Sequence, residues 1–343
     1  MQFGELKRRE IITLLGSAAV AWPLAARAQQ VDRIWRIGYL SATETEAEPQ
    51  AQSGHQTMEA ALARLGYVHG KNLVIERRLL SDRTGQVNEA AIELVAMQPD
   101  VIVAVNTPDV AAALSATKTI PIVFVNPADP IGSGFIATLA RPGGNATGTT
   151  GLTIELIAKR LEVLQEIAVG SARLGFVSME KDISLPLDHT NQIKFDAAAA
   201  TAKARGMTIG WRRLNSSRDE DVDALFASIV SSGDQALYVV FDPLTIGAQK
   251  RIADLAISNR IPAVYEIRDY VISGGLLSYT YLRAQNFERV AIFIDKIFKG
   301  AKPADLPVEQ PTRFELVINR RTAEAIGVQI PDKLWAIADE VIE

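Results

Sequence analysis

The chain contains no cysteine and has three histidines, and these shortages limit the chemistry open to it. Without cysteine there is no disulfide framework, no thiolate nucleophile and no Cys-ligated metal. His55, His69 and His189 are scattered along the sequence, so neither a His-based triad nor a zinc site is expected. The sequence also lacks a P-loop, a GxSxG motif and an HExxH motif. We therefore expect no enzyme activity, no cofactor and no metal site.

Long apolar runs and long basic runs are missing as well. The net charge is −4 and no long basic block occurs, which argues against nucleic acid as a partner. After the N-terminal segment, no apolar run approaches the length of a membrane span. The apolar content of 48% and charged content of 22% are ordinary for a soluble globular protein. A length of 343 residues favours two domains.

The N-terminal residues 1–28 have the order of an export signal. Lys7-Arg8-Arg9 is basic, Ile11–Ala21 is an apolar run too short to span a bilayer, and Ala26-Arg27-Ala28 supplies the small residues of a cleavage site. The adjacent Arg8 and Arg9 are typical of a twin-arginine signal. We expect export by the twin-arginine machinery, which would place a soluble mature protein in the periplasm. The alternative is a short amphipathic N-terminal helix.

Strand and helix patterns alternate from residue 33 onward. Val101–Val105 and Ile122–Val125 are short runs rich in β-branched residues, as in strands buried on both faces. Ile154–Ala168 and Asn286–Phe298 have the spacing of amphipathic helices. The repeated β-α-β-α order implies right-handed crossovers and parallel sheets. We therefore predict an α/β fold with two doubly wound parallel-sheet lobes.

The C-terminal elements do not follow the order of either lobe, so the chain is expected to cross between the lobes more than once. Such crossings form a multi-strand hinge, and hinges often contain glycine or proline. The candidate crossings are Gly148–Gly151, Gly274–Tyr279 and Pro307–Thr312. We assign residues 33–148 plus 280–306 to lobe 1, and residues 149–279 plus 307–343 to lobe 2.

Three predicted strands are followed by a short polar residue and then proline. The pairs are Thr107-Pro108, Asp129-Pro130 and Asp242-Pro243. This order suits a helix start, with the polar residue as N-cap and proline at the first helical position. Ligands of open α/β sheets bind at this edge. Thr107 leaves room for a ligand carboxylate, whereas Asp129 and Asp242 suit an amino group or a hydroxyl. The alternative is that all three residues only cap their helices.

Further polar residues are expected at the same edge of each sheet. Ser41 ends the first predicted strand and offers hydrogen bonds to a ligand. Asp182 and Ser184 follow a strand predicted at residues 173–178. Glu266 follows a strand of lobe 2 and is placed to meet a ligand amine. The alternatives are an ordinary loop for Ser41 and a capping or surface carboxylate for Glu266.

Two tyrosines are further candidates for ligand contact, and an acidic loop is a candidate for cation binding. Tyr265 and Tyr279 are each a candidate to stack on an apolar part of the ligand. The loop Ser41–Pro49 carries three glutamates, but their spacing is not that of a calcium site. We expect this loop to be solvated.

Long segments resemble a known family. They are RREIITLLGSAAVAWPLAARAQQ, GYVHGKNLVIE, TIPIVFVNPADPIGSGFIATLARPGGNATG, IPAVYEIRDYVISGGLLSY and GAKPADLPVEQPTRFELVINRRTAEAIG. The chain is similar, from Lys7 to Glu343, to the exported substrate-binding proteins of ABC transporters related to the tryptophan/tyrosine-binding group. The resemblance implies a type I periplasmic-binding-protein fold, with two lobes, three crossovers and a ligand in the cleft.

The expected function is that of a periplasmic solute-binding protein. It would capture a small polar or amphipathic, amino-acid-like molecule and deliver it to the transmembrane subunits of an ABC permease. Ligand contacts made by both lobes would favour the closed state. The alternative is a ligand-binding sensor subunit of the same fold that signals to a membrane receptor.

Overall fold

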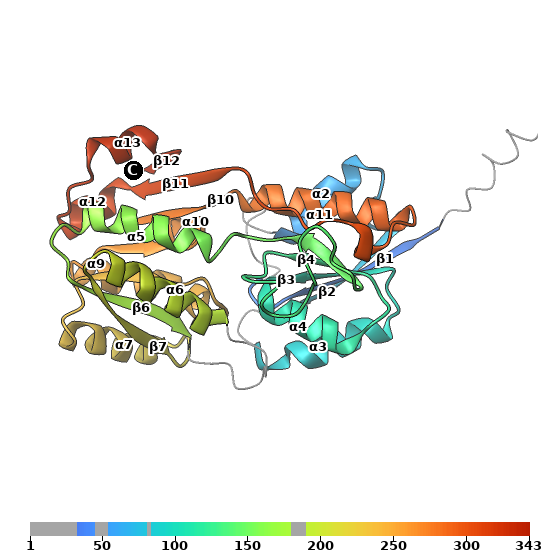
Figure 1. The fold of residues 1–343 in the computed structure, drawn as a ribbon, viewed down its shortest axis with the longest axis horizontal. Helices are drawn as coiled ribbons and strands as arrows, with labels where there is room; N and C mark the ends of the chain where they lie inside the picture. The colour runs from blue at the N-terminus through green and yellow to red at the C-terminus, as the bar shows by residue number, and fades with distance from the viewer. Residues whose placement is uncertain (1–32, 45–53, 81–83, 180–189) are drawn as a thin grey trace, which may run out of the picture.

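The computed structural model describes residues 33–44, 54–80, 84–179 and 190–343, which form two α/β lobes lying side by side (Figure 1). The expected export signal at residues 1–28 lies outside the described residues, as do Asp182 and Ser184. No helix of the described ranges has the length and apolar character needed to cross a membrane.

Lobe 1 is built on a parallel sheet of five strands in the order β2-β1-β3-β4-β5. The strands are β1 (Trp35–Ser41), β2 (Leu73–Leu79), β3 (Val101–Val105), β4 (Ile122–Val125) and β5 (Ala146–Thr149). The helices and 3₁₀ turns are α2 (Gly54–Arg64), η1 (Thr84–Gln86), α3 (Val87–Ala96), α4 (Asn106–Ala116), α11 (Arg283–Phe298) and η2 (Pro303–Asp305). Strands β3 and β4 are buried at every position because α2 and α11 cover one face and α3 and α4 the other.

Lobe 2 contains a sheet of seven strands in the order β12-β11-β10-β9-β8-β6-β7. The strands are β6 (Arg173–Met179), β7 (Thr208–Leu214), β8 (Ala236–Val239), β9 (Ala263–Tyr265), β10 (Leu277–Tyr281), β11 (Phe314–Asn319) and β12 (Glu340–Ile342). All neighbouring pairs are parallel except β10 and β11, which are antiparallel. This architecture confirms the predicted fold class and adds two reversed strands at one edge of the sheet, β11 and β12.

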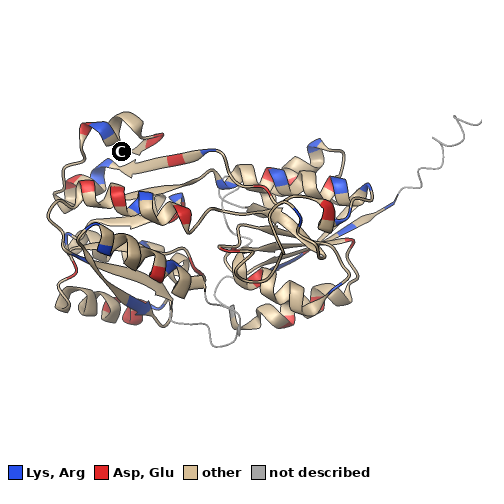
Figure 2. Ribbon diagram, in the orientation of Figure 1, with Lys and Arg blue, Asp and Glu red and all other residues tan. Residues whose placement is uncertain are grey.

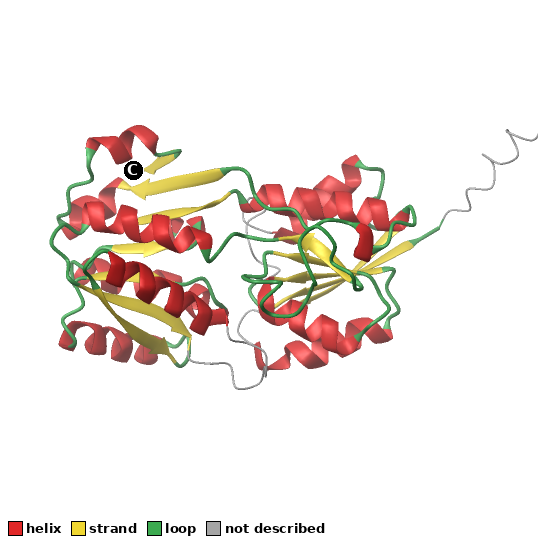
Figure 3. Cartoon of the chain, viewed as in Figure 1, coloured by secondary structure: helices red, strands yellow, loops and turns green. Residues whose placement is uncertain are grey.

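Helices cover both faces of the second sheet (Figure 3). They are α5 (Glu155–Ile167), α6 (Thr190–Ala204), α7 (Asp219–Ser231), α8 (Pro243–Gly247), α9 (Gln249–Ser258), α10 (Arg268–Ile272), α12 (Arg320–Ile326) and α13 (Asp332–Ile337). Helices α5 and α6 share one apolar cluster with the sheet, and α7 and α9 share the other. Charged residues of both signs are interspersed over these outer helices (Figure 2).

The chain crosses between the lobes after β5, after β10 and before β11. The first and third crossings run together, because Thr150 N donates to Glu309 O at 3.0 Å and Glu309 N donates to Gly148 O at 3.0 Å. The predicted crossing at Gly274–Tyr279 is wrong. Strand β10 continues to Tyr281 because it pairs with β11 along its whole length, and the chain leaves lobe 2 only at Leu282.

Candidate ligand-binding site

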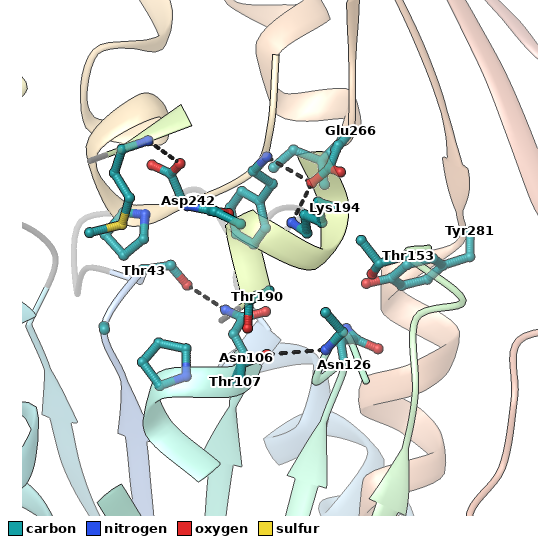
Figure 4. A pocket seen from close by; sticks show the side chains of 18 of the residues that line it. Thr43, Asn106, Thr107, Asn126, Thr153, Thr190, Lys194, Asp242, Glu266 and Tyr281 are labelled. Carbon is teal, nitrogen blue, oxygen red and sulfur yellow. Dashed lines mark hydrogen bonds and ion pairs between the residues drawn. The ribbon is translucent and has the colours of Figure 1, made fainter. Parts of the chain in front are cut away.

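A pocket lies between the two lobes, where the carboxyl ends of their strands face each other (Figure 4). It encloses about 810 Å³, part of it open to solvent, which is within the usual size of small-molecule sites. Lobe 1 lines it with Ala42, Thr43, Asn106, Thr107, Pro108, Asn126 and Ala128. Lobe 2 and the crossings line it with Thr153, Arg160, Met179, Thr190, Asn191, Lys194, Phe241, Asp242, Pro243, Glu266, Ile267 and Tyr281.

Two asparagines contribute to the polar part of the lobe 1 wall. Asn106 follows β3 and Asn126 follows β4, and both have left-handed backbones, with φ of 68° and 57°. Asparagine tolerates this conformation better than most residues, which favours it at these sharp strand ends. Asn106 Nδ2 donates to Thr43 Oγ1 at 3.1 Å, and Asn126 Oδ1 accepts from Asn286 Nδ2. The sequence reasoning missed these residues, although a Val-Asn pair at both strand ends was the available signal.

Thr107 lines the pocket, but its predicted role as N-cap is wrong. Helix α4 begins at Asn106 with Val105 as N-cap, so Thr107 lies in the first turn. Asn106 at the start of this helix has a left-handed backbone, and no side chain caps the helix. Thr107 Oγ1 instead accepts a hydrogen bond from Ala128 N at 3.1 Å, which joins the ends of β3 and β4.

Asp129 does not line the pocket, and its predicted role as a helix N-cap is also wrong. The described chain has a turn here, without a helix between β4 and β5. Asp129 Oδ1 accepts from Gly132 N at 2.8 Å and closes this turn. A Cβ atom at Gly132 would lie 2.1 Å from Asp129 Oδ2, so a larger residue there would have to displace this carboxylate.

Asp242 lines the pocket and is the N-cap of α8, as predicted. Its Oδ1 accepts from Leu244 N at 3.1 Å and Thr245 N at 2.9 Å, and Thr245 completes a capping box. Its Oδ2 accepts from Met179 N at 2.7 Å, which ties the end of β6 to α8. Burial raises the pKa of Asp242, and these backbone donors oppose the rise. The carboxylate is thus engaged within the protein.

Glu266 lines the pocket at the end of β9, and both of its carboxylate oxygens are engaged. Oε1 accepts from Tyr238 Oη at 2.9 Å. Oε2 accepts from Lys194 Nζ at 2.8 Å and from Phe241 N at 2.8 Å. Burial alone would raise the pKa of Glu266, but Lys194 and Arg160 outweigh it and hold the pKa below its usual value.

Arg160 is the largest fully buried side chain of the described residues and joins several strands of lobe 2. Its Nε donates to Tyr279 O at 2.8 Å, its Nη1 to Tyr238 Oη at 3.1 Å and its Nη2 to Glu266 O at 3.2 Å. Sequence reasoning missed it because an arginine in an amphipathic helix is usually solvent-exposed. Its position on the buried face of α5, beside Ile157 and Leu161, was the available signal.

The remaining predicted residues lie near the pocket without lining it. Ser41 is buried behind the lobe 1 wall, where its Oγ accepts from Glu44 N at 3.2 Å. Tyr265 stacks on Tyr270 in the core, and burial raises its pKa. Tyr279 packs against the core of lobe 2, and Tyr281 at the end of the same strand lines the pocket instead. The stacking roles predicted for Tyr265 and Tyr279 are therefore not supported by their positions.

Glu44 is buried, contrary to the expectation of a solvated loop. Its carboxylate accepts from Tyr39 Oη at 2.9 Å and lies 2.9 Å from His55 Nδ1. Burial and the neighbouring Glu44 raise the pKa of Tyr39. No group of three or more His, Asp or Glu side chains in the described part of the chain is arranged to hold a metal ion.

Residues 46–342 match the family model of the ABC transporter substrate binding proteins. The chain belongs to this family. Its members are substrate-binding proteins of ABC transporters. The chain is 27% identical over 274 residues to the tyrosine-binding protein of Clostridioides difficile (strain R20291), covering 78% of this chain and 75% of that protein.

Solved structures show the same fold. A conserved domain protein from Vibrio cholerae has a TM-score of 0.81 and 25% identity, covering 90% of this chain and 100% of that one. An ABC domain from Streptococcus pneumoniae in complex with L-Trp has a TM-score of 0.79 and 23% identity, with the same coverage. The fold is that of the type I periplasmic binding proteins, as the resemblance implied.

Proposed function

We propose that this family member captures an amino-acid-like solute between its lobes and delivers it to the transmembrane subunits of an ABC permease. The observation that carries the proposal is the interlobe pocket, which lobe 1 lines with hydroxyl and amide groups and lobe 2 with hydroxyl, amide and charged groups. The names of a tyrosine-binding relative and of a neighbour in complex with L-Trp support an amino acid as the ligand class.

The mechanism rests on the three crossings between lobes. A solute that contacts both walls gains its full set of interactions only when the lobes are close together, so it shifts the population toward that arrangement. The closed arrangement would then be the form that the permease recognises. Residues 1–28 would direct export, so that capture takes place in the periplasm; the twin-arginine route is proposed from Arg8-Arg9 alone.

The test is a thermal-shift screen of residues 29–343 against the twenty amino acids, followed by calorimetry on the hits. At a ligand concentration 100 times Kd, binding stabilises the protein by about 2.7 kcal/mol, which is a measurable shift. Asn191→Ala removes a pocket-lining amide and should weaken binding. The adjacent Gln192→Ala is the matched control, because Gln192 is exposed and does not line the pocket. A flat response to all twenty amino acids contradicts the proposal.

Delivery is tested separately in cells. Deletion of the gene should lower uptake of the solute identified by calorimetry, and expression of the chain should restore it. The alternative role as a sensor subunit stays a prediction. It requires unchanged uptake together with an altered transcriptional response to the same solute.

A further inference from the structure

A second pocket lies beside the crossings and shares no lining residue with the interlobe pocket. It encloses about 530 Å³, part of it open to solvent. Strand β5, the first two turns of α11 and the third crossing line it, and they contribute among others Thr149, Gln285, Asn286, Arg289, Glu309 and Thr312. Because all of these elements form or adjoin a crossing between the lobes, we call this cavity the hinge pocket.

Two side chains that line the hinge pocket each hold a buried polar atom without a hydrogen-bond partner. Thr149 is 1% exposed, and its Oγ1 has no partner among the described residues. Gln285 is half-buried, and its Oε1 is unpartnered in the same way. Buried polar groups are nearly always hydrogen-bonded in native proteins, because an unpaired one is unfavourable. These two atoms therefore point to an occupant of the hinge pocket that pairs with them.

The pairing of the crossings fixes the direction of the Thr149 side chain. Thr149 and Glu309 form a parallel bridge between the first and third crossings. Residues paired in this way project their side chains to the same side. The Glu309 carboxylate reaches Arg289 of α11, so the Thr149 hydroxyl also faces α11. The hydroxyl is thus directed toward the helix that forms the opposite wall of the hinge pocket.

The charges of the hinge pocket cancel each other. Arg289 and Glu309 are the only ionisable side chains among its described lining residues. Arg289 Nη2 donates to Glu309 Oε1 at 2.6 Å, and Arg289 Nε donates to Glu309 Oε2 at 2.5 Å. Because neither charge is left over, the lining favours a neutral occupant. A hydroxyl group fits both unpaired atoms, since it can donate to Gln285 Oε1 and can pair with the Thr149 hydroxyl in either direction.

Asn286 connects the hinge pocket to the interlobe pocket. Its side chain is 2% exposed and lines the hinge pocket. Its Nδ2 donates to Asn126 Oδ1, on a residue that lines the interlobe pocket, and to Thr150 O in the first crossing at 3.3 Å. A molecule held between α11 and the crossings therefore contacts the segments that must change when the lobes approach or separate.

We propose that the hinge pocket binds a small neutral polyol, which acts as an effector of solute binding. Hydroxyls of the polyol pair with Thr149 Oγ1 and Gln285 Oε1 and tie α11 of lobe 1 to the first and third crossings. Occupancy favours the arrangement described here, in which both lobes line the interlobe pocket, and so tightens solute binding. The polyol site stands independently of the proposed solute-binding function, whereas the effector role rests on that function.

Methyl NMR of residues 29–343 tests the site, with glycerol, erythritol and ribitol as probes. A thermal shift alone does not serve, because osmolytes stabilise proteins in general by exclusion from their surface. At least one of the three probes should shift the methyl signals of Thr149 and Thr312 in a saturable way. The methyl signal of Thr119, an exposed residue in the loop before β4, should not respond.

Variants separate the two unpaired atoms from the fold. Thr149→Val keeps the shape of the side chain and removes the hydroxyl. It should be as stable to heat as the wild type, because the hydroxyl has no protein partner, and should bind the polyol at least about tenfold more weakly. Gln285→Met removes the carbonyl oxygen and should weaken binding in the same way. Thr119→Val is the matched control and should bind as the wild type does.

Calorimetry tests the effector role with the amino acid that the thermal-shift screen identifies. Saturating polyol should lower the Kd of this amino acid at least about fivefold in wild-type protein and leave it unchanged in Thr149→Val.

The outcomes distinguish the site, its effector role and the proposed function. If no probe binds in a saturable way, or if Thr149→Val binds within about twofold of wild type, the polyol site is overturned while solute binding stands. If the polyol binds through Thr149 but the Kd of the amino acid does not change, the effector role is overturned. If no amino acid binds, the solute-binding function and the effector role fail, and the polyol titration still decides the site.

Discussion

The buried guanidinium of Arg160 leads to a strong stability prediction for lobe 2. Arg160→Met leaves the carbonyl oxygens of Tyr279 and Glu266 without their donors, and each unsatisfied buried acceptor costs about 1–3 kcal/mol. It also removes one of the two cations that face the Glu266 carboxylate. Breaking a buried ion pair by removing one partner costs about 3–5 kcal/mol, so we expect a loss of that size.

Urea unfolding followed by tryptophan fluorescence measures this loss, and thermal unfolding should show a fall in Tm of roughly 6–20 °C. Arg205→Met is the matched control, because Arg205 is partly exposed and its loss should cost less than about 1 kcal/mol. Arg160→Lys should be intermediate, since lysine keeps the charge but not the planar fork of donors. A loss below about 1 kcal/mol in Arg160→Met would refute the view that this side chain holds β8, β9 and β10 together.

Three further predictions concern the pocket residues Asp242 and Asn106 and the buried Asp109 of α4. Asp242→Ala should lower the free energy of unfolding by about 2–4 kcal/mol in urea titrations, because it removes a helix cap and leaves the buried Met179 N–H without its acceptor. A loss under about 1 kcal/mol would contradict this prediction. Burial raises the pKa of Asp109 in the folded protein well above its pKa in the unfolded chain. The stability contributed by the protonated carboxyl is therefore complete below the unfolded-state pKa and is lost as the pH rises through the folded-state pKa. Stability measured from pH 4 to pH 8 should therefore fall less steeply in Asp109→Asn, whose Oδ1 can still accept from Ala42 N, and equal slopes would oppose this account. Asn106→Ala replaces a residue that tolerates the left-handed region with one that tolerates it poorly, and should cost about 1–2 kcal/mol more than Asn106→Gly, as measured by thermal unfolding; equal stabilities would show that the turn is not strained.

The strands and long helices of this protein are predictable from the sequence because local patterns specify them. Runs of β-branched residues fix β3 and β4, and a regular apolar spacing fixes α7. The short elements α10, α13 and β12 carry no such pattern. They are held by distant partners, as in the ion pair of Arg268 with Glu340 at 2.6 Å and the pairing of β12 with β11.

The site shows the same division between local and distant causes. The role of Asp242 as N-cap is predictable because the sequence Asp-Pro-Leu-Thr contains both halves of its capping box. Thr107 and Asp129 precede proline in the same way, but a left-handed asparagine in one case and a glycine turn in the other change the outcome. The burial of Arg160 and Lys194 depends on strands that are distant in sequence, so their chemistry becomes visible only when lobe 2 is assembled.

The interleaved path of the chain has a consequence for the order in which the protein can fold during synthesis. Lobe 1 needs α11 to cover its sheet, and lobe 2 needs β11 to complete its antiparallel pair with β10. Both elements lie in the last quarter of the chain, so a ribosome that has made residues 1–280 has finished neither lobe. The nascent chain must therefore hold two incomplete apolar cores until the C-terminal segment emerges, and a fragment that ends before α11 is expected to aggregate or be degraded.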